Sequence, residues 1–134
     1  MVKRITAKTY DSVRYKGFLS VAGNFEEAAL LAFEFEYYNA SGVLFIHSAI
    51  ALADAITIKL AGRKSSGENH YEVINLIERV VPANRINKKA LTNFKSLIDH
   101  KNLISYTGDI YHKKDVEKIK RYFLNFKVWA VSLM

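Results

Sequence analysis

Hydrophobic residues occupy nearly every side of the stretch 39–61, which reads NASGVLFIHSAIALADAITIKLA. At 3.6 residues per turn, one face carries Val43, Ile46, Ile50, Ala53 and Leu60, and the opposite side carries Phe45, Ala49, Leu52 and Ile56. A helix that is apolar all round must be buried on all sides, by protein or by lipid. Its length almost reaches a membrane span, but an aspartate such as Asp54 inside a span costs a few kcal/mol. The pattern therefore predicts the central helix of a soluble bundle and no membrane association.

Helical spacing of apolar residues predicts four further helices, at about 10–37, 69–81, 87–104 and 113–133. Gly23 weakens the first of them, and a break there would leave Asn24 as the cap of a shorter helix. Asn39 or Ser41 is expected to cap the central helix, which Gly62 then ends. The last helix has the clearest stripe, formed by Val116, Ile119, Phe123, Phe126, Ala130 and Leu133.

No alternating strand pattern and no internal repeat interrupts these helices. The prediction is an all-α, up-and-down antiparallel helical bundle of about five helices. The chain of 134 residues suits one domain, 1–134, with residues 1–9 as an N-terminal arm. The absence of cysteine excludes a disulfide framework and a thiolate metal site. The basic N-terminus has no apolar run after it, so no signal peptide is predicted, and a cytoplasmic location is expected.

The net charge of +7 is unevenly placed along the chain. Residues 1–62 hold six Lys/Arg and six Asp/Glu, whereas residues 63–134 hold fourteen and seven, so the whole excess lies in the second part. Such asymmetry is consistent with a polyanionic partner, and equally with a solvated basic face.

Polar residues within the apolar stretch are the first candidates for chemistry. His47 and Asp54 are seven residues apart and share one face of the central helix. We interpret both as a structural polar core, because buried polar groups are usually paired by hydrogen bonds. None of the four histidines forms the i, i+4 pair of a helical zinc site, so neither a metal nor a cofactor is expected.

A second polar cluster closes the fourth predicted helix, at residues 100–106 (HKNLISY). Lys101, Asn102 and Tyr106 provide a cation, an amide and a phenol that could meet a phosphate backbone. The alternative is a helix C-terminus at which lysine and histidine oppose the helix dipole. The residues alone leave both interpretations open.

The order of helices, the motif IHSA at 46–49 and the run 97–122 resemble the HEPN family, small helical domains named for nucleotide binding in higher eukaryotes and prokaryotes. The resemblance covers about residues 16–134. It implies an up-and-down bundle, a homodimer and, in many members, a metal-independent RNase that acts as a toxin beside a small nucleotidyltransferase antitoxin. The family motif is an arginine, often followed by a polar residue, with a histidine four to six residues after the arginine, near the end of the penultimate helix.

At the corresponding place this chain has Lys101, Asn102 and Tyr106, so lysine replaces the arginine and tyrosine the histidine. Lysine lacks the planar fork of arginine, and tyrosine is a poor general base at neutral pH. Some branches of the family also carry tyrosine in place of the histidine. Arg63 and His70 have the family spacing but lie after the central helix, where the motif does not sit, and we interpret that match as chance.

Two functions follow as expectations. The first is HEPN-like binding of RNA or a nucleotide, with weak or lost RNase activity, in a toxin–antitoxin setting. Its site would use Lys101, Asn102 and Tyr106, with the electrostatic field of Lys113, Lys114, Lys118 and Arg121 converging on the same end of the bundle. The second is a non-catalytic homodimeric protein-interaction module.

Overall fold

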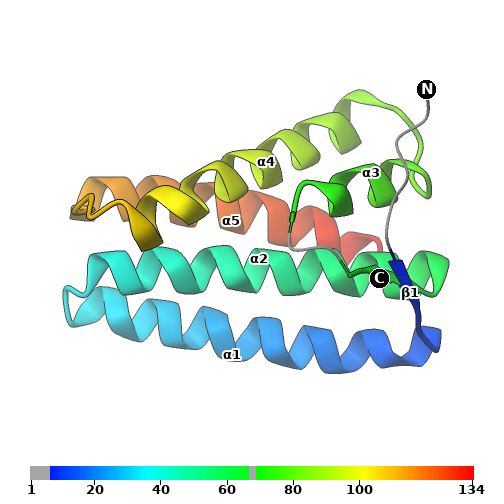
Figure 1. Ribbon diagram of the computed structural model, residues 1–134, viewed down its shortest axis with the longest axis horizontal. Coiled ribbons are helices and arrows are strands. Elements are labelled where there is room, and N and C mark those ends of the chain that lie inside the picture. Colours follow the sequence, from blue (N-terminus) through cyan, green and yellow to red (C-terminus); the bar gives the residue numbers. More distant parts are fainter. Residues whose placement is uncertain (1–6, 67–68) are drawn as a thin grey trace.

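Five α-helices make up most of the chain, which we describe from a computed structural model covering residues 7–66 and 69–134 (Figure 1). They are α1 (Tyr15–Glu34), α2 (Tyr38–Ala61), α3 (Glu72–Glu78), α4 (Arg85–Tyr106) and α5 (Lys113–Ser132). A 3-10 turn, η1 (Ser12–Arg14), precedes α1. The predicted all-α bundle is confirmed, and α3, expected to span 69–81, is the shortest helix.

The helix α2 is the core of the bundle, as its apolar composition predicts. It contacts α1, α3, α4 and α5, and its buried side chains run from Ser41 to Ile58. It is also long and apolar enough to cross a membrane by length and composition, yet 67% of its most apolar window is buried inside the protein. Gly62 ends it in the left-handed conformation, with φ of 65°. That conformation favours glycine because it has no Cβ.

Aromatic side chains join α2, α4 and α5. Phe45 of α2 packs on Phe123 of α5 with ring centroids 5.4 Å apart, and Phe94 of α4 packs on Phe126 of α5 at 4.9 Å. Trp129 donates a 2.8 Å hydrogen bond from Nε1 to Oδ1 of Asn87. Both ends of this buried indole are therefore satisfied, one by apolar contact and one by a polar partner.

The structure differs from the sequence-based expectations at Gly23 and in two short strands. The helix α1 continues through Gly23, so Asn24 caps nothing, because α1 packs against α2 along its length and tertiary contact outweighs glycine's low propensity. The N-terminal arm is partly a strand: β1 (Ala7–Thr9) pairs antiparallel with β2 (Arg63–Ser65), which lies in the expected loop after α2. The rest of that arm, residues 1–6, lies outside the described residues.

Asn39 does not cap α2 either, because its side chain is engaged by the turn between α4 and α5 at the same end of the bundle. Its Nδ2 donates to the backbone oxygens of Ile104 (3.1 Å) and Asp109 (2.9 Å), and its Oδ1 accepts from the backbone nitrogen of Tyr111 (2.8 Å). One amide thus holds both sides of the α4–α5 turn against the start of α2.

Replacing Asn39 by Ala should lower the free energy of unfolding by about 1–3 kcal/mol, because backbone groups of the turn lose their partners. Urea unfolding measures this change. Asn102→Ala is the control, since Asn102 is exposed on α4 and a surface change should stay within about 0.5 kcal/mol. Equal losses in the two variants would contradict the clamping role of Asn39.

Candidate anion site

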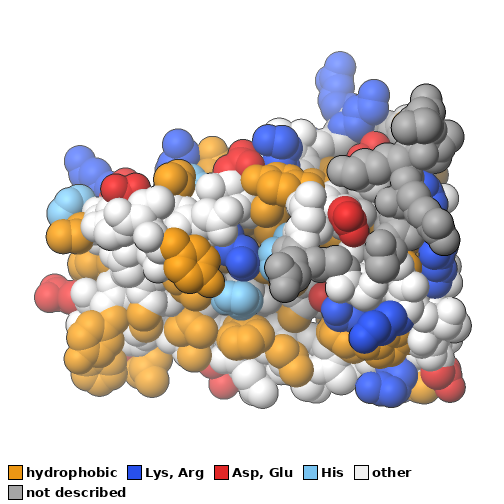
Figure 2. Space-filling model, viewed as in Figure 1, with side chains coloured by type: hydrophobic (Ala, Val, Ile, Leu, Met, Phe, Trp, Pro, Cys, Tyr) orange, Lys and Arg blue, Asp and Glu red, His pale blue; other side chains and the backbone are white. Residues whose placement is uncertain are grey.

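Two histidines and a lysine from separate segments lie close together on one side of the bundle. They are His47 of α2, His70 of the turn before α3, and Lys101 of α4, and each is half-buried. Their charges act on one another: Lys101 lowers the pKa of both histidines, and His47 adds to the effect on His70. Figure 2 shows two pale blue histidine side chains beside a blue basic one in the middle of this face. We call these three residues the cation cluster.

Burial is the largest cause of the lowered pKa of each histidine, and neighbouring positive charge comes second. Within residues 7–66 and 69–134, no hydrogen bond or ion pair involves His47, His70 or Lys101. The ring of His47 lies against that of Phe25 of α1, with 5.7 Å between the centroids. The cluster therefore has donors available for an anion and no described carboxylate paired with it.

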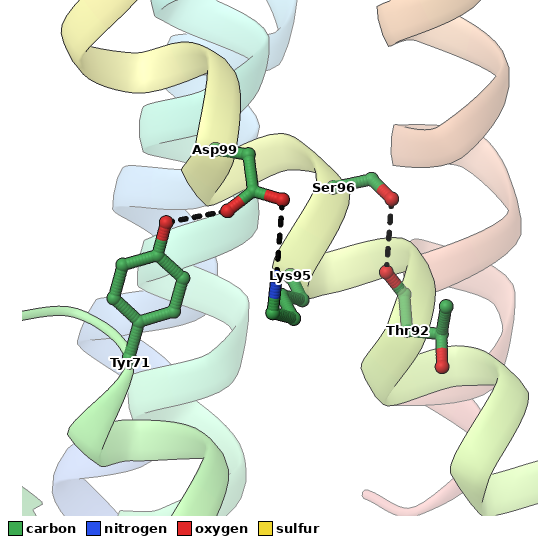
Figure 3. Close-up of polar contacts among 5 residues, drawn as sticks. All are labelled: Tyr71, Thr92, Lys95, Ser96 and Asp99. Carbon is green, nitrogen blue, oxygen red and sulfur yellow. Dashed lines mark hydrogen bonds and ion pairs between the residues drawn. The ribbon is translucent and has the colours of Figure 1, made fainter.

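Hydrogen bonds around Tyr71 place His70 in the cluster. The backbone nitrogen of Tyr71 donates to Oδ1 of Asn69 at 3.0 Å, which closes the turn that bears His70. The Tyr71 hydroxyl donates to Oδ1 of Asp99 at 2.5 Å, and Lys95 approaches the other oxygen of Asp99 at 3.3 Å (Figure 3). Because Asp99 lies on α4 two residues before Lys101, this contact ties the histidine turn to the helix that carries the lysine.

The hydrogen bond to Asp99 is the main cause of the raised pKa of Tyr71, which is about 12. Burial and the negative charge of Asp99 also raise this pKa. Figure 3 also shows Ser96 and Thr92 on the same stretch of α4, where the Ser96 hydroxyl donates to the backbone oxygen of Thr92 at 3.1 Å. The Ser96 bond is thus local to α4, whereas Asp99 is the residue that contacts Tyr71.

Asp54 lies two turns along α2 from His47 and is paired with a different cation. Its Oδ2 is 3.8 Å from Nζ of Lys64 on β2, and the residue is 8% exposed. Burial raises the pKa of Asp54 to about 6, and Lys64 opposes that rise. The sequence-based assignment of Asp54 to a polar core agrees with this burial, whereas His47 has no hydrogen bond of the expected kind within the described residues.

The raised pKa of Asp54 predicts how the stability of the protein depends on pH. Between pH 3.8 and about 6 the folded chain binds more protons than the unfolded chain, so stability should fall as pH rises through this window. Asp54→Asn mimics the neutral form and should raise the free energy of unfolding by on the order of 2–3 kcal/mol at pH 8.

Below about pH 3 the same substitution should change stability little, because Asp54 is then mostly neutral in both the folded and the unfolded state. Urea unfolding of wild type and Asp54→Asn at about pH 3 and at about pH 8 measures the difference. A variant that is less stable than wild type at pH 8 would show that the Lys64 pair outweighs the cost of burying the charge.

The side chains of the three residues proposed from the family motif lie on different sides of α4. Lys101 turns toward the histidines, whereas Asn102 is about 100° further around the helix, and Tyr106 is one turn beyond Asn102 on the same side. Asn102 is exposed and Tyr106 is 78% exposed at the end of α4. Within the motif, the structure brings only Lys101 into the cation cluster.

The basic residues of α5 lie on more than one side of that helix. Lys118 lies near α4, because its charge lowers the pKa of His100, and its Nζ is 5.9 Å from the ring centroid of Tyr122 on its own helix. Lys114 and Arg121 instead line a groove of about 530 Å³ with Phe33 of α1. Lys113 is the first residue of the helix and is exposed. Their charges contribute to a diffuse field rather than to a single row.

His100, near the end of α4, is not part of the cation cluster and contacts the segment that follows the α4–α5 turn. His100 Nδ1 is 2.7 Å from the hydroxyl of Tyr111, and burial is the first cause of its lowered pKa. This contact joins α4 to the segment before α5, so His100 already has a partner.

His70 is the member of the cluster that sequence reasoning missed. The spacing from Arg63 drew attention to it, but Arg63 is exposed on β2 and is not part of the cluster. Nothing in the local sequence around His70 shows that the turn folds back onto α4. The one usable signal was Tyr71, a large polar-tipped side chain at the start of a short helix.

Comparison of the chain with protein-family models, curated proteins and solved structures finds no match. The HEPN resemblance therefore stays a prediction, and functional argument rests on the geometry of the cation cluster.

Proposed function

We propose that this protein binds RNA through its phosphates, with the cation cluster as the central contact. The observation that carries the proposal is that His47, His70 and Lys101 converge from three segments and that no carboxylate of residues 7–66 and 69–134 is paired with them. Asp54, the nearest acidic group on α2, is engaged by Lys64. A bound phosphate would supply the missing negative charge and accept hydrogen bonds from all three side chains.

Exposed residues beyond the cluster fit an extended ligand better than a small one. Tyr106 presents its ring to solvent at the end of α4, where a base could stack on it. Lys113, Lys114, Lys118 and Arg121 add positive charge on the neighbouring helix. We therefore favour single-stranded RNA over a free nucleotide, and the toxin–antitoxin setting with a nucleotidyltransferase partner rests on the family resemblance alone.

The first test is the salt dependence of binding to a short labelled single-stranded RNA, measured by fluorescence anisotropy. Lys101→Ala should weaken binding and remove roughly one unit from the slope of log affinity against log salt. Lys89→Ala is the matched control, because Lys89 is exposed on the same helix about 18 Å away along its axis. No binding at low salt, or an equal loss in the control, would overturn the proposal.

The second test is pH. Because burial keeps the histidines neutral near pH 7, an anion should favour their protonation, and affinity should rise as pH falls from 8 to 5.5. His47→Ala and His70→Ala should flatten this rise. Asp54 becomes neutral over the same range, so the comparison is made in the Asp54→Asn background.

Two further measurements distinguish RNA binding from nucleotide binding and from RNA cleavage. A mononucleotide that competes as well as the RNA would indicate a nucleotide-binding protein. RNA that is cut by wild type and stays intact with His47→Ala would give the cluster a catalytic role, since histidine is the usual general acid or base. The second candidate function, an interaction module without chemistry, is favoured by a separate observation, the exposed apolar side chains of α1.

A further inference from the structure

The ion pair between Asp54 and Lys64 is held by distance alone and not by a hydrogen bond. Nζ of Lys64 is 3.8 Å from Oδ2 of Asp54, which is beyond hydrogen-bond length. The same nitrogen donates at 3.2 Å to the backbone oxygen of the next residue, Ser65. An ammonium group carries three donors. Within residues 7–66 and 69–134, Lys64 therefore has a donor left for a further acceptor.

The two partners of this pair differ in their access to solvent. The side chain of Asp54 is 12% exposed, and that of Lys64 is 28% exposed. A ligand from solvent can thus reach the lysine more readily than the carboxylate. The lysine stem is also flexible, so its ammonium group can leave Asp54 without a movement of β2.

Lys64 lies between the buried carboxylate and the cation cluster. The strand β2 contacts both α2 and α3, and His70 is in the turn that leads into α3. Three positive groups, Lys101, His47 and Lys64, lower the pKa of His70, whereas Lys64 is the charged group that acts on Asp54. On α2, His47 and Asp54 share one face and are about 10 Å apart along the axis. Lys64 therefore borders the cluster on the Asp54 side.

Given RNA binding at the cation cluster, as proposed above, we infer that Lys64 is a fourth phosphate contact of this site and that Asp54 competes with the RNA for its ammonium group. A phosphate next to the one bound in the cluster offers both charge and hydrogen-bond acceptors. Asp54 at 3.8 Å offers charge alone. When Lys64 turns to the phosphate, the buried carboxylate loses its cation and takes up a proton from solvent.

Asp54 is therefore a positioning residue that touches no RNA and acts through Lys64. While it is ionised it holds Lys64 away from the strand, and the site binds with three cations. Once it is neutral, the site binds with four. Neutralising Asp54 should thus tighten RNA binding and add a phosphate contact.

The salt dependence of RNA binding at pH 8 tests the inference, because Asp54 is ionised there in wild type. Asp54→Asn should raise the affinity for the labelled single-stranded RNA by roughly three- to tenfold. It should also steepen the slope of log affinity against log salt by roughly one unit, since one more phosphate is neutralised. Unchanged affinity and slope would overturn the inference.

Glu34→Gln is the matched control, because it makes the same change in net charge at an exposed site roughly 20 Å away along the bundle. It should leave the slope unchanged. An equal gain in this control would show a general effect of net charge and would contradict the role of Asp54.

A double-mutant cycle separates contact by Lys64 from any effect of Asp54 on stability. In a Lys64→Gln background, Asp54→Asn should no longer steepen the slope, whereas in a Lys64→Arg background it should. A steeper slope without a cation at position 64 would overturn the inference. RNA binding that needs Lys101 but ignores Asp54→Asn would overturn this inference and leave the proposed function standing. No RNA binding at low salt would overturn both.

Discussion

Replacing Ile46 by Asp should abolish folding. Ile46 lies in the middle of α2 with no exposed surface, and its neighbours on every side are helices of the same bundle. A carboxylate there would be buried without a partner, which costs several kcal/mol, against a total stability of about 5–15 kcal/mol for a domain of this kind. Circular dichroism of the purified variant should show loss of the cooperative thermal transition.

Ile86→Asp is the control for this substitution, because it makes the same chemical change at a site that is 72% exposed. Residue 86 lies in the first turn of α4, where a negative charge interacts favourably with the helix dipole. This variant should melt within a few degrees of wild type. An Ile46→Asp protein that also melts like wild type would show that α2 is not the centre of the bundle.

Phe123→Ala should have the second-largest effect, a loss of about 3–5 kcal/mol in the free energy of unfolding. Phe123 is fully buried and packs on Phe45, so truncation removes the main aromatic contact between α5 and α2 and leaves a cavity. Urea unfolding gives the change from the midpoint and the slope.

Val128→Ala on the same helix should change stability by less than about 0.5 kcal/mol, because its side chain is mostly exposed. The comparison separates the loss of packing from any effect of α5 helix propensity. If Phe123→Ala lost no more than Val128→Ala, the contact between α5 and α2 would contribute little to stability.

Helix type and the identity of the central helix could be read from the sequence. Residues 39–61 are apolar on every side, and this alone predicts a helix buried on all sides, which the structure shows as α2. The stripe of α5 predicted its buried face, from Val116 to Ala130, because every third or fourth residue returns to one side. Gly62 marked the end of α2 through its own backbone preference.

Local sequence signals predicted the wrong structure at positions where tertiary contacts determine the conformation. Gly23 lowers helix propensity by about 1 kcal/mol, but packing against α2 outweighs that amount. Asn39 has the chemistry of a cap, yet the turn between α4 and α5 takes all of its hydrogen bonds. The β1–β2 pair is only three residues long on each side, too short for a period of two to show.

The candidate site depended on the tertiary structure more than the fold did. The sequence determined that Lys101 lies near a helix end and that His47 lies on the central helix. Only the folded chain places the two beside His70, because the Tyr71–Asp99 hydrogen bond holds a turn of the chain against α4. Periodicity reports which face of a helix is apolar, but it carries no information about which helix that face will meet.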